Sequence, residues 1–146
     1  RTTLALFAGA SGDHNPIHID LDVARRAGLP DVFAQGMLGI AWVGRLLTGW
    51  VPQRHLRRFE VRFQGITHLG HAMRCSGRVV EKLEVAGERC VRIELQSSNQ
   101  YGQTSIVGDA LVARNDPHVT KALAENESAH VSAAAAQEVL AGESGR

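Results

Sequence analysis

Residues 36–50 read GMLGIAWVGRLLTGW, and almost every side chain in this stretch is apolar. A helix that is apolar all round is buried, either in a protein core or in a membrane. Fifteen residues are too few to span a bilayer, and Arg45 interrupts the run. The stretch therefore predicts a central helix inside a core. We expect Gly39, Gly44 and Gly49 to let a sheet approach it closely, although each glycine costs a helix about 1 kcal/mol.

The chain that follows this helix alternates between apolar and polar residues, as half-buried strands do. The apolar members of the alternating runs are Phe59, Val61, Phe63, Met73, Cys75, Val79, Leu83, Val85, Val91, Ile93 and Leu95. Residues 106–113 are apolar on both faces apart from Asp109, which predicts a central strand. Tight connections at Ala86-Gly87 and Tyr101-Gly102 predict antiparallel pairing. We therefore expect an α+β fold in which a curved antiparallel sheet wraps around the central helix.

The predicted hairpin also bears on the two cysteines, Cys75 and Cys90. If the chain turns at Ala86-Gly87, Cys75 lies opposite residues near 98, so a disulfide with Cys90 is not expected. The chain also begins without a charged and then apolar leader. Both features favour a reducing, cytoplasmic location.

The chain before the central helix predicts two short helices. Residues 2–10 form the first, with Thr2 or Thr3 as cap, and its apolar members Leu4, Leu6 and Phe7 are available for burial. Asp20 or Asp22 caps the second, which ends at Ala27. A crossing loop over residues 29–35 then leads to the central helix.

Between these two helices lies the polar stretch SGDHNPIH, residues 11–18. The Asn15-Pro16 step predicts a turn that points the Asp13 carboxylate and the His18 imidazole at one spot. Such a pair can take one proton while another is delivered, as the addition or loss of water requires. The alternative is an ordinary Asx-turn, in which Asp13 and Asn15 satisfy backbone amides and His18 caps the next helix.

Phe7 together with residues 11–18, Ala24 and residues 34–38 resembles the signature of the MaoC-like (R)-specific enoyl-CoA hydratases, also called hydratase 2. The similarity loosely covers residues 1 to about 114 and implies a hot-dog fold. Relatives usually carry a strand before the first helix, whereas this sequence starts at the helix, so two alternatives stay open: the sheet lacks that strand, or the N-terminus has been lost. Many relatives also keep a small hydroxyl residue in the first half of the central helix, where this chain has Gly39 and Gly44.

The resemblance implies catalytic roles for three residues. Asp13 and His18 would activate water and return a proton, giving an (R)-3-hydroxyacyl-CoA. Gly36 would place a backbone N–H against the thioester oxygen, and the positive end of the helix dipole would support it. The alternative for Gly36 is only an easy turn into the helix.

Other residues are candidates for binding the substrate. Asn15 would orient the loop or the water, with a cap of the loop as the alternative role for Ser11, and Gln35 and Met37 flank Gly36 within the matching stretch. The triplet of Arg54, Arg57 and Arg58 follows the central helix and suits the phosphates of CoA, although solvated surface arginines are the commoner outcome.

Composition limits the partners. The 146 residues are 44% hydrophobic and 21% charged, with a net charge of +1, so neither nucleic acid nor a membrane is an expected partner. We expect an acyl-CoA or acyl-ACP substrate, no metal, and no cofactor because the CoA thioester is the substrate itself. An open sheet edge predicts a homodimer or higher oligomer.

Two other functions stay open at this point. One is a dehydratase acting on fatty, mycolic or steroid side-chain acids. The other is a non-catalytic hot-dog subunit that binds acyl chains. Residues 1–114 form the predicted domain, and the Ala-, Glu- and Ser-rich residues 115–146 a flexible tail in which 131–140 could be helical.

Overall fold

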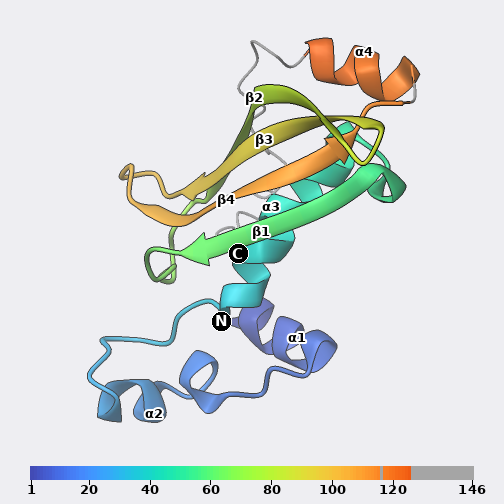
Figure 1. The fold of residues 1–146 in the computed structure, drawn as a ribbon. Coiled ribbons are helices and arrows are strands. Elements are labelled where there is room, and N and C mark those ends of the chain that lie inside the picture. The colour runs from blue at the N-terminus through green and yellow to red at the C-terminus, as the bar shows by residue number, and fades with distance from the viewer. Residues whose placement is uncertain (116, 126–146) are drawn as a thin grey trace, which may run out of the picture.

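The computed structural model of the protein describes residues 1–115 and 117–125. Its elements, in chain order, are α1 (Thr2–Ser11), the 3-10 turn η1 (Pro16–His18), α2 (Leu21–Arg26), α3 (Gly36–Trp50), the 3-10 turn η2 (Gln53–His55), β1 (Leu56–Phe63), β2 (Arg74–Val85), β3 (Glu88–Ser98), β4 (Thr104–Ala113) and α4 (Pro117–Glu125). The four strands form one antiparallel sheet that curves over α3 (Figure 1). This arrangement confirms the predicted α+β, hot-dog architecture.

The sheet has the order β1-β4-β3-β2, so the strand predicted to be central lies between two neighbours. β2 and β3 are joined by a two-residue turn at Ala86 and Gly87, whose φ angles of 51° and 79° are those of a type I′ turn. The resulting register places Cys75 opposite Ser97, as predicted, and both cysteines are free.

The helix α3 is buried on one face only. Leu38, Val43, Leu46 and Leu47 are buried, and the last three join the core beneath the sheet. Met37 on the other face is exposed. The expectation of burial all round is therefore wrong for a single chain, because one four-stranded sheet covers one side of the helix. None of the described helices is both long and apolar enough to cross a membrane.

The three glycines of α3 differ in what they face. A Cβ on Gly39 would lie 2.8 Å from Ile106 Cδ1, and one on Gly44 would lie 3.8 Å from Phe59 Cε1. A Cβ on Gly49 would meet no described atom within 4 Å. Close approach therefore holds at Gly39 alone, and there a side chain of the sheet, not its backbone, makes the contact.

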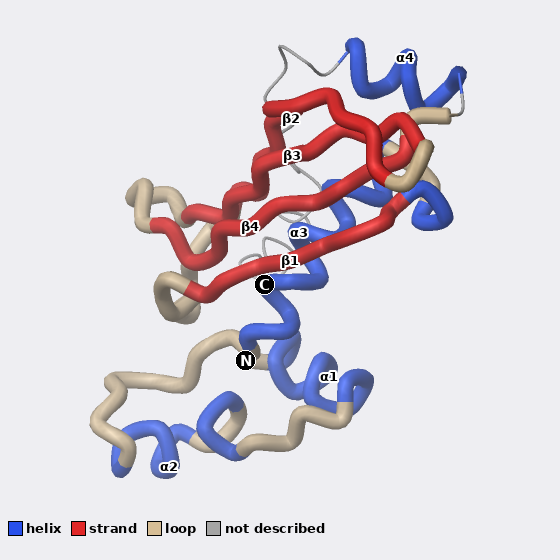
Figure 2. The backbone as a smooth tube through the Cα atoms, viewed as in Figure 1, coloured by secondary structure: helices blue, strands red, loops and turns tan. Residues whose placement is uncertain are grey.

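A separate layer covers the first turns of α3, where α1, η1 and α2 lie beyond the end of the sheet (Figures 1 and 2). Its own small core contains Leu4, Ala24, Val32 and Leu38. Asp20 caps α2 by accepting from the backbone N–H groups at positions 22 and 23, as predicted. Two expectations for α1 are wrong: Arg1 is the N-cap residue with no side-chain cap, and Leu6 is exposed.

The segment after β4 forms the helix α4 at the opposite end of the molecule from α1 and α2 (Figure 1). Val119 is only 2% exposed and belongs to the main core cluster. The sequence predicted a tail from residue 115 onward, whereas the structure gives Pro117–Glu125 a helix whose Val119 is buried in the core. The rest of the predicted tail, including the possible helix 131–140, lies outside the described residues.

Candidate active site

The loop after α1 is built from consecutive side-chain turns. Gly12 has φ 77°, a left-handed conformation that lets the chain leave α1. Ser11 Oγ donates to the Phe7 carbonyl over 2.7 Å and accepts from the Asp13 N–H over 3.2 Å. Asp13 Oδ1 accepts from the Asn15 N–H at 3.3 Å, and Asn15 Oδ1 accepts from the Ile17 N–H at 3.2 Å.

These are the contacts expected for the Asx-turn alternative. They leave most of the hydrogen-bond acceptor sites of the Asp13 carboxylate unused. An ionised carboxylate has two oxygens and about four acceptor sites, and the turn uses one of them. The turn therefore fixes the position of Asp13 while leaving it able to bind a water or a proton.

His18 is held differently from Asp13. Its side chain is 8% exposed, and Nδ1 lies 2.9 Å from the Phe33 carbonyl oxygen. A carbonyl only accepts, so Nδ1 carries the proton, and in the neutral ring the lone pair is on Nε2. The rings of His18 and Phe33 also meet edge to face at 4.6 Å. His18 does not cap the next helix, since Asp20 does, and that part of the alternative is wrong.

The described residues include no hydrogen bond between the side chains of Asp13 and His18. The loop thus brings an anchored carboxylate and an anchored imidazole into one short stretch without pairing them. Groups left unpaired in this way remain able to bind a third molecule.

The Phe33 carbonyl that orients His18 is itself fixed by the loop after β1. Phe33 forms an isolated antiparallel bridge with His68, and the Ala34 N–H donates to the Thr67 carbonyl over 2.9 Å. This pairing sets the backbone of residues 33–35 directly before α3.

The turn between β3 and β4 contacts the loop after β1 and supports it. Gln100 accepts from the Ala72 N–H over 2.9 Å and donates to the Gly70 carbonyl over 3.1 Å. Buried Asn99 lies with Nδ2 3.2 Å from His71 Nδ1. Burial lowers the pKa of His71, and nearby His68 adds to the shift. Sequence reasoning gave Asn99 and Gln100 no role, although polar residues beside the predicted turn at Tyr101-Gly102 were a visible signal.

The N-terminus of α3 opens on a cavity. Its volume is about 340 Å³, and it is lined by residues 33–36, Gly39, residues 63–67, Ser105 and Ile106. The first N–H groups of a helix have no acceptor within the helix, and here Gly36 begins it without a side-chain cap from Gln35. The cavity therefore adjoins backbone donors and the positive end of the helix dipole.

Gln35 and Met37 flank Gly36 in different surroundings. Gln35 is 1% exposed, and its Nε2 donates to the Leu4 carbonyl over 2.9 Å, which ties α1 to the start of α3. Its Oε1 is buried without a partner among the described residues. Met37 is exposed. The Gln35 side chain thus makes a structural contact through Nε2, and its predicted contact with substrate stays a prediction.

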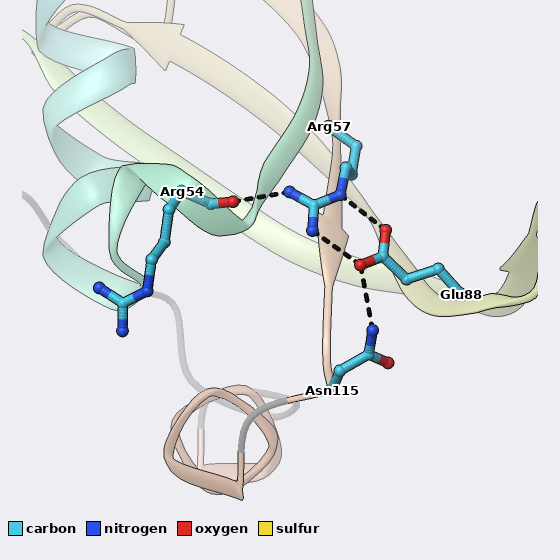
Figure 3. A network of polar contacts seen from close by, with 4 residues as sticks. All are labelled: Arg54, Arg57, Glu88 and Asn115. Carbon is cyan, nitrogen blue, oxygen red and sulfur yellow. Dashed lines mark hydrogen bonds and ion pairs between the residues drawn. The ribbon is translucent and has the colours of Figure 1, made fainter.

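The arginine triplet lies at the other end of α3. Arg57 donates to both oxygens of Glu88 over 2.6 and 2.7 Å and to the Arg54 carbonyl over 2.6 Å, and Asn115 donates to Glu88 over 3.0 Å (Figure 3). The bond from Arg57 lowers the pKa of Glu88, and the same bond raises the pKa of Arg57. This network joins the start of β1 to the start of β3 and the end of β4.

Arg58 also pairs with an acid. It alternates with Phe59, which faces α3, so Arg58 points to the outer face of the sheet, where it donates to Asp109 over 2.6 Å. This bond raises the pKa of Arg58. The contacts of Arg57 and Arg58 favour surface ion pairs over a phosphate site, and neither residue lies near Gly36.

With this geometry in hand, the chain can be compared with known proteins. Residues 1–100 match the family described as the MaoC like domain. The chain belongs to this family. That membership makes it a relative of dehydratases and hydratases, the class whose chemistry adds or removes water.

Two solved structures illustrate the proteins that share the fold of this MaoC-like chain. The R-hydratase PhaJ1 from Pseudomonas aeruginosa is 29% identical, with a TM-score of 0.67 over 77% of this chain and 73% of that one. The HadBC 3R-hydroxyacyl-ACP dehydratase complex from Mycobacterium tuberculosis shares the fold at 14% identity, with a TM-score of 0.59 over 77% of this chain and 85% of that one.

A curated relative is far longer than this chain. The fatty acid synthase beta subunit TOXC of Cochliobolus carbonum is 29% identical over an alignment of 114 residues, and the alignment covers 74% of this chain but only 5% of that protein. The chain therefore matches one small part of that synthase subunit.

Proposed function

We propose that this MaoC-like protein is a hydro-lyase that adds water to a trans-2-enoyl-CoA, giving an (R)-3-hydroxyacyl-CoA, or runs the reverse dehydration. The observation that carries the proposal is the hydrogen bond from His18 Nδ1 to the Phe33 carbonyl. This bond leaves Nε2 as the basic atom of a neutral imidazole, in the same loop as the anchored Asp13 carboxylate.

In the proposed reaction, Asp13 and His18 bind one water between them. The water oxygen bonds to the β-carbon while a proton passes to His18 Nε2, and the π electrons of the alkene move onto the thioester oxygen. The Gly36 N–H and the dipole of α3 stabilise that negative oxygen. The imidazolium then gives this proton to the α-carbon while the thioester C=O re-forms, which completes the hydration and leaves His18 neutral again. The reaction exchanges water and protons only, so we propose no redox cofactor.

The remaining predicted binding residues differ in the role that we propose for them. Asn15 and Ser11 act through the loop, because their side chains bond its backbone. Met37 is placed beside Gly36 on the exposed face of α3 and would meet substrate or a second subunit. We leave Arg57 and Arg58 out of the proposed site, since both are committed to carboxylates.

The simplest test follows the conjugated enoyl absorbance of crotonyl-CoA in the presence of the purified protein. We expect the absorbance to fall and the product to be the R enantiomer of 3-hydroxybutyryl-CoA, identified by chiral chromatography after hydrolysis. No loss of absorbance at micromolar protein, with the protein folded by circular dichroism, would contradict the proposal.

A second candidate is the dehydration of 3-hydroxyacyl groups on acyl carrier protein. The similarity to part of a fatty acid synthase subunit and the shared fold with an acyl-ACP dehydratase complex favour it. Comparing 3-hydroxybutyryl-CoA with 3-hydroxybutyryl-ACP in the same assay separates the two, since the preferred carrier has the higher kcat/KM.

We also propose that the chain works as a homodimer or higher oligomer. The exposed face of α3 and the open edges of the sheet at β1 and β2 leave apolar and hydrogen-bonding groups for a second copy. Sedimentation velocity at micromolar concentration should give at least a dimer. An active monomer would show that the site is complete in one chain.

A further inference from the structure

The aromatic side chain of Phe63 covers the glycine at the start of α3. Phe63 ends β1 and pairs with Ile106 of β4, and both side chains face α3. A Cβ on Gly36 would lie 2.9 Å from Phe63 Cζ and 3.0 Å from Cε1, so the ring packs directly on the glycine backbone. Since Phe63 is nevertheless 52% exposed, much of the ring faces open space.

The same ring forms a wall of the 340 Å³ cavity at the N-terminus of α3. Ligand cavities usually range from about 300 to 1,000 Å³, so this one is near the small end. Ile106 lines the cavity as well, and its Cδ1 lies against Gly39, about one turn along the helix. Phe33 is a further lining residue, and its ring contacts His18 of the proposed catalytic loop.

We infer that Phe63 determines the acyl-chain specificity of this site by closing the cavity beside Gly36, so that the protein selects short acyl groups. The inference rests on the proposed function, because it takes Gly36 as the point where the thioester oxygen binds. It adds what kind of acyl-CoA the site accepts.

The physical reason is steric. A thioester held at the Gly36 N–H carries its acyl chain into space bounded by the Phe63 ring and Ile106. A long chain must displace the ring from its contact with Gly36, whereas a four-carbon chain does not reach beyond it. One methylene that fits or fails to fit an apolar pocket changes specificity by about 10–200-fold.

The experiment compares four-carbon with eight-carbon substrates in wild type and in Phe63→Ala. Hydration of crotonyl-CoA and 2-octenoyl-CoA gives a ratio of kcat/KM values, and calorimetry with butyryl-CoA and octanoyl-CoA gives a ratio of Kd values. We expect wild type to favour the short chain, and Phe63→Ala to shift both ratios toward the long chain by at least about tenfold. Phe63→Leu, which keeps an apolar side chain of intermediate size, should shift them less and covers the case in which the alanine variant does not fold.

Phe59→Ala is the matched control. Phe59 lies on the same strand and the same face, where its ring lies near Gly44 at ordinary contact distance. It is more buried than Phe63 and packs on the main core. Truncating it should therefore lower the melting temperature more than Phe63→Ala does, with no change in the chain-length ratios.

The outcomes separate the two proposals. If wild type hydrates crotonyl-CoA but the Phe63 variants keep both ratios, the specificity inference is wrong and the hydratase stands. If no enoyl-CoA is hydrated yet the Kd ratio shifts in the Phe63 variants alone, the hydratase is wrong and the inference stands. Equal shifts in the Phe59 control would overturn the inference, as would a wild type that binds neither acyl-CoA.

Discussion

The two ends of α3 differ in what surrounds them, although each holds a buried polar atom without a described partner, Gln35 Oε1 at the start and Trp50 Nε1 at the last residue. At the C-terminal end, Arg57 donates two hydrogen bonds to Glu88, and Asn115 donates a third. At the N-terminal end, Gly36 opens on a cavity. Arg57 of the arginine triplet therefore makes structural contacts, whereas the proposed chemistry lies where few charges gather. Substitutions at the N-terminal end should therefore lower activity more than stability, and substitutions at the C-terminal end should lower stability more than activity.

The largest effect is expected at the loop that we propose to be catalytic, residues 11–18. Asp13→Asn keeps an oxygen that can accept from the Asn15 N–H, so the turn should survive while the carboxylate charge is lost. His18→Gln removes the basic Nε2. Each change should lower kcat for crotonyl-CoA hydration by about 10²–10⁴, the usual range for general acid–base groups.

The double variant sharpens this prediction. Residues that act as one unit lose most of their benefit with the first deletion, so the double variant should be little slower than the slower single one. Melting temperatures serve as the control, since a purely structural turn would lose stability and keep its turnover. Full activity in either single variant would refute the proposed mechanism.

A smaller loss of activity is expected from Gly36→Ala. The new Cβ would stand 2.9 Å from Phe63 Cζ, so the ring must shift and the approach to the helix N-terminus narrows. Misplacing reacting groups by about 1 Å can cost about 10²-fold, and we expect kcat/KM to fall by up to that factor.

Gly49→Ala is the control at the other end of the same helix. A Cβ there meets no described atom within 4 Å. Alanine favours a helix over glycine by about 1 kcal/mol in the interior and by less in the last turn, so this variant should melt slightly higher and keep its activity. An equal loss of activity in both variants would mean that α3 as a whole, and not its first turn, is sensitive.

The sequence predicted those features that depend on local pattern. The bounds of α3 agree with the apolar run 36–50, and the hairpin at Ala86-Gly87 fixed the register of Cys75 correctly. The Asp20 cap followed from a local rule as well.

The features that the sequence did not predict depend on contacts between distant segments. No periodicity relates Phe63 to Gly36, and Arg57 meets Glu88 across 31 residues of chain. Val119 and Leu123 stand four residues apart in the sequence, an amphipathic spacing that reading the segment by composition passed over, and Val119 is buried. The exposed face of α3 was missed for a related reason, since an apolar pattern does not tell what covers it.

A third prediction concerns Val119 of α4. Full burial of an apolar side chain of this size contributes about 1.5–3 kcal/mol, so Val119→Ala should lower the free energy of unfolding by about 1–2 kcal/mol. Ala124 is exposed on the same helix, and Ala124→Ser should change stability by less than about 0.5 kcal/mol. Urea denaturation measures both. Equal stability of the two variants would show that α4 does not dock in solution.

The smallest effect is expected from the ion-pair network, where Glu88→Gln removes one charge of the pair with Arg57. Both side chains are partly exposed, so the melting temperature should fall only slightly at neutral pH, and less in high salt. Because the bond from Arg57 lowers the folded-state pKa of Glu88, its contribution is present above the unfolded-state pKa and is lost as the pH falls through the folded-state value. Wild type and Glu88→Gln should therefore differ at pH 7 and converge in acid, with equal activity throughout. A difference in melting temperature that is constant at all pH values would mean that packing, not charge, causes the effect. A lower kcat/KM in Glu88→Gln would indicate that the arginine residues after α3 take part in substrate binding.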